Sequence, residues 1–204
     1  MRTLLLCLCL ALLPACKKRD TPLEAIAAAA VSPTQGRTAA AHMLVTDWQA
    51  GKVKLDDAIN LAFEMVESAK SGKPPLGRSA VPTSTAATEF AGCVLDATKF
   101  LDGKIPTGAE HEIFWMRVGG LAFAAAEEAR ANGRNSDALD LVLAGHPRWQ
   151  NDAYWYMHPT HDGLTSLIMA ENGMRSEAVT RLRRRADLQG LAADVYKALT
   201  GGDY

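Results

Sequence analysis

The sequence predicts an all-α protein, and three observations lead to this fold class. β-branched and aromatic residues never alternate with polar ones over a useful length, so signals of β-strands are nearly absent. Apolar residues instead recur at spacings of three and four, which is the period of an amphipathic helix. Residues typical of a turn between two helices occur at Asn132-Gly133 and again 40 residues later, at Asn172-Gly173.

The first fifteen residues, 1–15, are predicted to be a signal sequence. Arg2 supplies one positive charge, residues 4–13 carry no polar side chain, and small residues follow them. A helix of this length spans only about 15 Å, half of the hydrocarbon core of a bilayer. The segment is therefore too short for a permanent membrane span.

The end of this signal, Leu13-Pro14-Ala15-Cys16, resembles the lipobox of bacterial lipoproteins. The resemblance implies cleavage before Cys16, a diacylglycerol on its thiol, an N-acyl lipid on its new amino terminus, and a lipidated tether over residues 16–23. Several acyl chains together hold a protein firmly at a membrane. Lys17 follows the cysteine, and by resemblance to Gram-negative lipoproteins this favours the outer membrane. The alternative is an ordinary secretory signal cut after Ala15.

Composition limits what the mature chain can be. About 189 residues remain after cleavage, enough for one compact domain or a short repeat array. Removing the charge of Arg2 changes the net charge from -1 to -2, a balance that does not favour nucleic acid. Cys7 and Cys9 leave with the signal, so Cys93 is the one thiol left beside Cys16, and no internal disulfide is expected. Cys93 lies on an apolar helix face, where thiols are usually inert.

Residues 24–70 are predicted to form the N-terminal helices. An Ala-rich stretch over 24–31 predicts a short helix that ends before Ser32-Pro33, and residues 38–50 predict a second helix that stops at Gly51. A third helix starts at Leu55. The apolar positions are Ala41, Leu44, Val45 and Trp48 in the second helix and Leu55, Ile59, Ala62, Phe63 and Val66 in the third.

A linker over residues 71–84 separates these helices from the rest, because its glycines and prolines exclude a helix. Residues 85–101 resume the helical pattern. Thr107 and Glu110 then form a capping box that opens the longest predicted helix, 109–132. Gly119-Gly120 within it costs about 1 kcal/mol per glycine relative to alanine, and we expect it to allow another helix to approach closely. The inward positions of the helix at 85–101 are Phe90, Cys93, Val94, Ala97 and Leu101.

A repeat is visible in the second half of the chain, where residues 132–139 recur as residues 172–179. Each block is predicted to end one helix at Asn-Gly, where a left-handed backbone costs little, and to begin the next with a serine cap and an acidic first turn. Ala138 and Ala178 then lie where two helices cross. A weaker echo is Ala50-Gly51 followed by residues 56–59, with two extra residues in the turn.

These blocks resemble the helix-turn-helix of the tetratricopeptide repeat (TPR), on the turn glycine and the small residue of the second helix, Gly133 with Ala138 and Gly173 with Ala178. The Trp-Leu-Gly-Tyr pattern and the closing proline of that family are absent, and the period exceeds 34 residues. The resemblance implies that residues 85–204 form a helical repeat region, stacked as a short TPR-like α-solenoid. An irregular helical bundle is the alternative.

The densest cluster of unusual residues lies between the two blocks, in residues 146–162. Exposed tryptophan and tyrosine beside an arginine would make a partner-binding patch, because these residue types dominate interface hot spots. The alternative is that the rings pack the two helical hairpins together. The candidate partner-binding residues are Arg148, Trp149, Tyr154, Trp155 and Tyr156.

The same segment contains a weak metal pattern. His158, His161 and Asp162 could supply two imidazoles and a carboxylate to Zn²⁺, with His146 as a further ligand. The spacing differs from His-Glu-x-x-His, and Pro159 opposes a regular helix through the pair. Asp162 also fits the N-cap of a helix that begins at Gly163 or Leu164. We therefore expect neither a metal nor any cofactor besides the lipid.

Residues 181–185, Arg-Leu-Arg-Arg-Arg, are the other irregularity. Leu182 continues the apolar stripe that passes through Ala178, and the arginines are expected to spread over the solvated face. The alternative is an anionic target such as lipid headgroups.

No phosphate-binding loop, nucleophile elbow or Cys-x-x-Cys pair occurs, so the sequence does not favour an enzyme and names no catalytic residue. It favours a lipid-anchored binding or assembly module that holds another envelope protein on a helical repeat surface. TPR-like lipoproteins that assist outer-membrane machines such as pilus secretins are the nearest resemblance in role. Two alternatives stay open: a lipoprotein-delivered cell-to-cell effector, and a small metal-dependent hydrolase that uses His146, His158, His161 and Asp162.

Overall fold

The computed structural model describes residues 21–74, 79–101, 109–145, 159–185 and 188–202, without the side chains of 109–112 and 159–160. Within these ranges the chain forms nine α-helices and no strand, which confirms the predicted all-α class. The helices are α1 (Pro22–Ala30), α2 (Gly36–Gln49), α3 (Leu55–Ser71), α4 (Ser84–Phe100), α5 (Ala109–Ala131), α6 (Asn135–Gly145), α7 (Pro159–Glu171), α8 (Arg175–Arg183) and α9 (Leu191–Thr200).

The first five helices begin within two residues of the predicted positions. α1 begins earlier than its Ala-rich stretch because Thr21 and Glu24 form a capping box around Pro22. Of the predicted linker, residues 72–74 and 79–83 lie outside helices as expected, whereas Ser71 is the last residue of α3 and Ser84 is the first residue of α4. The capping box predicted at Thr107 and Glu110 lies outside the described side chains.

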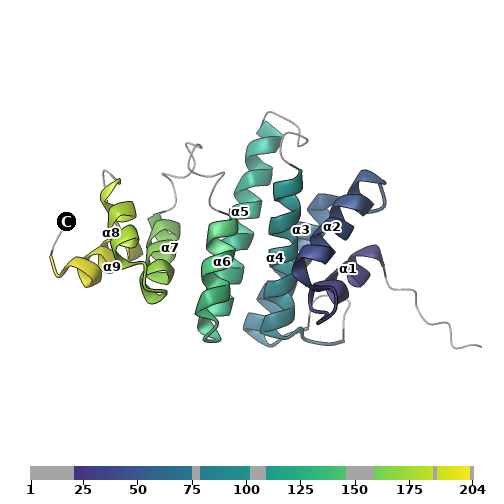
Figure 1. The fold of residues 1–204 in the computed structure, drawn as a ribbon, viewed down its shortest axis with the longest axis horizontal. Coiled ribbons are helices and arrows are strands. Elements are labelled where there is room, and N and C mark those ends of the chain that lie inside the picture. Colours follow the sequence, from purple (N-terminus) through teal and green to yellow (C-terminus); the bar gives the residue numbers. More distant parts are fainter. Residues whose placement is uncertain (1–20, 75–78, 102–108, 146–158, 186–187, 203–204) are drawn as a thin grey trace, which may run out of the picture.

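The helices stand side by side in one elongated array, with α1 and α2 at one end and α8 and α9 at the other (Figure 1). The even-numbered helices α2, α4 and α6 contact one another in succession, and so do α3, α5 and α7. Helices adjacent in the sequence also pack together, with the exception of α2 and α3, so the array has two rows. α9 continues the odd-numbered row by packing on α7.

Two apolar clusters support this array. The larger one runs from Ile26 in α1 to Ile168 in α7, and α4 lies at its centre because it contacts α1, α2, α3, α5 and α6. All five inward positions predicted in α4 are fully buried. The second cluster is small and joins α8 and α9 through Leu182, Ala192 and Val195.

The same turn occurs at three connections between helices, and at two of them it closes a packed hairpin, α5 with α6 and α7 with α8. Gly51, Gly133 and Gly173 have left-handed φ angles of 68°, 73° and 83°. In each turn the amide after the glycine donates to a carbonyl five residues back, over 2.9 Å, in the pattern of a Schellman motif. These bonds run from Lys52 to Asp47, from Arg134 to Ala129 and from Met174 to Met169. The predicted repeat of the turn is confirmed, including its weaker echo.

The predicted serine caps are wrong. α8 begins at Arg175, its N-cap is Met174 without a side-chain hydrogen bond, and the hydroxyl of Ser176 donates to Glu177. Ser136 likewise lies inside α6, which begins at Asn135. After Gly133 and Gly173 the next helix begins two residues later, so the serines are already helical. The acidic first turns at Asp137 and Glu177 are confirmed. Ala138 and Ala178, predicted where two helices cross, are fully buried.

Close approach between helices occurs at a different glycine from the one predicted. A Cβ on Gly120 would lie 3.5 Å from the ring of Phe63, an ordinary contact. A Cβ on Gly163 would lie 2.7 Å from the backbone nitrogen of Ala192 and 2.8 Å from the carbonyl carbon of Leu191. The backbone of α9 therefore rests directly on the first turns of α7. Of the helices described, none combines the length and the apolar character that crossing a membrane requires.

The repeated turn gives a testable prediction. Gly173→Ala should lower the free energy of unfolding by about 1–2 kcal/mol, because a Cβ is strained at this left-handed φ. Gly202→Ala is the control, since Gly202 has ordinary φ and open space around it, and its effect should stay within about 0.5 kcal/mol. Urea unfolding followed by circular dichroism measures both. Equal stability of the two variants would contradict the assigned turn.

Candidate functional site

The segment that carries most of the predicted functional residues connects α6 to α7. The structure does not describe residues 146–158, so the partner-binding patch and most of the metal pattern lie outside the described residues. These residues are Arg148, Trp149, Tyr154, Trp155, Tyr156, His146 and His158. The structure does describe the first turn of α7, at which this segment ends.

α7 begins at Pro159, which suits the first turn of a helix because its missing amide has no helical partner there. His161 in this turn stacks face to face on Phe123 of α5, with ring centroids 4.0 Å apart and an interplanar angle of 15°. Asp162 lies inside the helix. The prediction that it caps a helix beginning at Gly163 or Leu164 is therefore wrong, because the helix begins earlier.

The carboxylate of Asp162 is buried between two guanidinium groups. Its side chain is 2% exposed, and its Oδ1 accepts a hydrogen bond from Arg181 Nη2 over 2.8 Å. Arg185 Nη1 donates to Oδ2. Both arginines come from α8 and the residues just after it, so this cluster fastens α8 to the first turn of α7. Charged hydrogen bonds of this kind are the strongest polar contacts in proteins.

The expectation that the arginines of residues 181–185 spread over the solvated face is wrong for two of them. Arg181 and Arg185 are only 15% and 6% exposed. Burial lowers the pKa of Arg181, and the charge of Asp162 opposes that effect. Arg183 and Arg184 are exposed as expected, and Leu182 is fully buried.

The described residues offer little chemistry for catalysis. Both oxygens of Asp162 are occupied by cations, which leaves this carboxylate poorly placed to bind a metal ion. No group of three or more histidine, cysteine, aspartate and glutamate side chains in the described part of the chain could hold one. Cys93 is fully buried, and burial, aided by the charge of Asp96, raises its pKa to about 12. Its thiol therefore stays protonated at neutral pH.

Two polar contacts join the α7–α8 hairpin to the α5–α6 hairpin. The guanidinium of Arg130 in α5 binds both carboxylate oxygens of Glu171 in α7, over 2.7 and 2.6 Å. The side-chain amide of Asn172 donates to the carbonyl of Asn135, over 3.0 Å. Sequence reasoning missed these contacts, although Arg130 and Glu171 both lie just before the recurring Asn-Gly turns.

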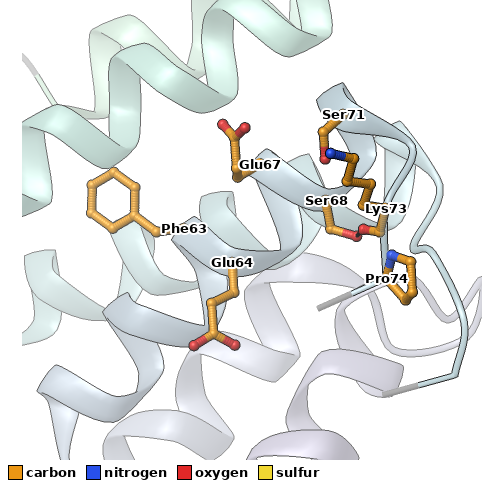
Figure 2. A pocket seen from close by; sticks show the side chains of 7 residues that line it. All are labelled: Phe63, Glu64, Glu67, Ser68, Ser71, Lys73 and Pro74. Carbon is orange, nitrogen blue, oxygen red and sulfur yellow. Dashed lines mark hydrogen bonds between the residues drawn. The ribbon is translucent and has the colours of Figure 1, made fainter. Parts of the chain in front are cut away.

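A groove of about 510 Å³ lies along the C-terminal half of α3. The hydroxyl of Ser68 donates to the carbonyl of Lys73, which folds the chain back at the end of the helix. Figure 2 shows Phe63 and Glu64 projecting from one turn of α3 and Glu67 from the next, with the other lining residues toward the end of the helix. Those residues are Ser68, Ser71, Lys73 and Pro74. Phe63 was expected on the apolar face of its helix, and the groove was not predicted from the sequence.

Comparison of the chain with protein families, with curated proteins and with solved structures found no match.

The buried cluster gives a second prediction. Asp162→Asn should lower the free energy of unfolding by about 3–5 kcal/mol, because it removes the buried negative charge that pairs with the guanidinium groups of Arg181 and Arg185. Asp137→Asn removes a half-exposed carboxylate that pairs with Arg134, and should cost at most about 1 kcal/mol. Urea unfolding of both variants measures the difference. A loss for Asp162→Asn as small as that of the control would show that the cluster is not a main support of α8.

Proposed function

We propose that this chain is a membrane-anchored envelope lipoprotein whose helical repeat surface binds another envelope protein or assists its assembly. The observation that carries the proposal is the set of hairpins closed by one recurring turn and stacked side by side. Stacked hairpins of this kind offer an extended surface to which several helices contribute. The same observation supports a short TPR-like α-solenoid as the finer description of the fold.

The anchor of the proposed lipoprotein is Cys16. Its support is the lipobox-like sequence before it, and Lys17 favours the outer membrane as the destination. A lipid at Cys16 would leave residues 17–20 as a short tether ahead of Thr21, which caps α1. The helical array would therefore stay close to the membrane surface and meet partners embedded there.

The proposed contact with the partner is the aromatic segment between α6 and α7. The segment joins the α5–α6 hairpin to the α7–α8 hairpin. A partner that binds hot-spot residues there could therefore also contact both hairpins. The ion pairs of Asp162 and the stacking of His161 on Phe123 fix the helix at which the segment ends. The metal-dependent hydrolase is not carried forward, because Asp162 is committed to two arginines. No described contact favours the effector.

The anchor can be tested directly. In a Gram-negative host fed a labelled fatty acid, the chain should incorporate the label and sediment with membranes. Cys16→Ser should abolish labelling and leave the chain at precursor size, because the lipid is required before the lipoprotein peptidase cleaves. Cys93→Ser should label normally. A Cys16→Ser chain that is processed to normal size would instead indicate an ordinary secretory signal.

The binding role has its own test. The anchored chain should copurify with a defined envelope protein after crosslinking, and Trp155→Ala with Tyr156→Ala should weaken that complex by about tenfold or more, as hot-spot aromatics do. Phe100→Ala removes an exposed ring at the end of α4 and should leave binding unchanged. The partner's affinity for the purified chain is the measurement. If the variant with Trp155→Ala and Tyr156→Ala binds the partner as tightly as Phe100→Ala does, the two rings serve packing and not binding.

A further inference from the structure

The contact between α3 and α5 pairs most of its charges. Arg117 of α5 donates to Asp56 over 2.6 Å and to Asn60 over 2.5 Å. Further along, Lys70 of α3 pairs with Glu127 of α5 over 2.9 Å. Between these links the ring of Phe63 lies beside Gly120. Arg117, Asp56, Lys70 and Glu127 therefore each have a partner on the facing helix.

Glu64 and Glu67 are the exception. Both line the groove on α3, both are exposed, and neither forms an ion pair in the described part of the chain. Residues three apart on a helix are neighbours, and two like charges at that spacing repel by a few tenths of a kcal/mol. Within the described residues, two neighbouring carboxylates without an ion pair thus lie beside the half-buried ring of Phe63, and the charge of Glu67 also acts on Lys70 one turn away. Lys73, at the far end of the groove, is the single basic residue among those that line it.

The helix that faces this groove exposes apolar side chains nearby. Met116 lies one turn before Gly120 and is 43% exposed. Ile113 lies about one turn earlier and is 54% exposed. Exposed methionine is common on surfaces that bind partner segments, because its side chain adapts to different shapes. The acidic groove is therefore followed along α5 by accessible apolar surface.

We propose that the groove on α3 binds a segment of a partner protein in which a lysine or arginine neighbours an apolar residue. The cation lies between Glu64 and Glu67, and its methylene stem lies on the ring of Phe63. The apolar neighbour packs toward Met116. This inference rests on the proposed function, because it names the chemistry of a partner for the same helical array.

Three properties of the groove favour this occupant. Two carboxylates accept the several donors of an arginine, and such charged hydrogen bonds are strong. An aromatic ring attracts a cation that lies within about 6 Å of its centre. The long stems of lysine and arginine cover apolar surface while their charges stay near solvent. The ammonium of Lys73 repels a second cation, so the groove takes one basic side chain.

A selection experiment tests the inference. The full chain, purified in mild detergent, is used to select binders from a phage library of random short peptides. The selected peptides should be enriched in lysine or arginine next to an apolar residue. A labelled copy of the most enriched peptide is then titrated with the chain, and fluorescence anisotropy gives the affinity.

The variants locate the site. Glu67→Gln should weaken binding of that peptide by about tenfold, a change of 1.4 kcal/mol, and Glu64→Gln with Glu67→Gln should weaken it further. Asp57→Asn is the matched control, because it removes one exposed carboxylate of α3 that does not line the groove. It should leave the affinity unchanged. Binding should also fall as salt is raised, since the contact is charged.

The inference is wrong if the selected peptides lack basic residues, or if Glu67→Gln and Asp57→Asn bind equally well. Self-association of the chain that the double glutamine variant abolishes would assign the groove to a second copy and overturn it as well. If the peptide does not bind the groove but binding of the crosslinked envelope protein still requires Trp155 and Tyr156, only the present inference fails and the proposed function is unaffected. Absence of any envelope partner, by contrast, removes the proposed function itself.

Discussion

The C-terminal half of the array depends on two adjacent residues in the first turn of α7. Asp162 binds Arg181 of α8 and Arg185, which lies just after that helix. Gly163 allows the backbone of α9 to lie directly against this part of α7. The apolar cluster between α8 and α9 is small, so burial of apolar surface alone supplies little support there. Charge pairing and close backbone contact therefore hold the last two helices, and they meet where residues 146–158 join α7.

The N-terminal half is stabilised differently, by the large apolar cluster centred on α4. Its polar contact of comparable geometry is the pair formed by Arg37 and Asp96, over 2.6 and 3.1 Å, with the guanidinium of Arg37 resting on Gly92. Burial by itself would raise the pKa of Asp96, but hydrogen bonds and charges from Arg37 and Lys99 outweigh it and lower the pKa. This pair supplements a core to which every helix from α1 to α7 contributes.

Local signals in the sequence predicted the helices and turns well, and contacts between distant residues explain the errors. Glycine after asparagine defines the turns at Gly133 and Gly173 because φ is a local property. An amphipathic pattern assigns every arginine to solvent, so it missed Arg181 and Arg185, whose partner lies on another helix. The groove was missed for the same reason. Glu64 and Glu67 differ from Asp56 and Lys70 of the same helix in lacking an ion pair with the described side chains of α5, and such pairs cannot be read from the sequence.

The stacking of hairpins also constrains how a partner could use both proposed contacts. α3 lies toward one end of the array, and the ends of α6 and α7 that flank the aromatic segment lie further along it (Figure 1). A partner that reaches both must therefore be extended along the array. Two weak contacts on one rigid surface act together, because the second forms at the high effective concentration set by the first. A short tether at Cys16 would add a third restraint, so modest affinity at each contact suffices for a specific complex at the membrane.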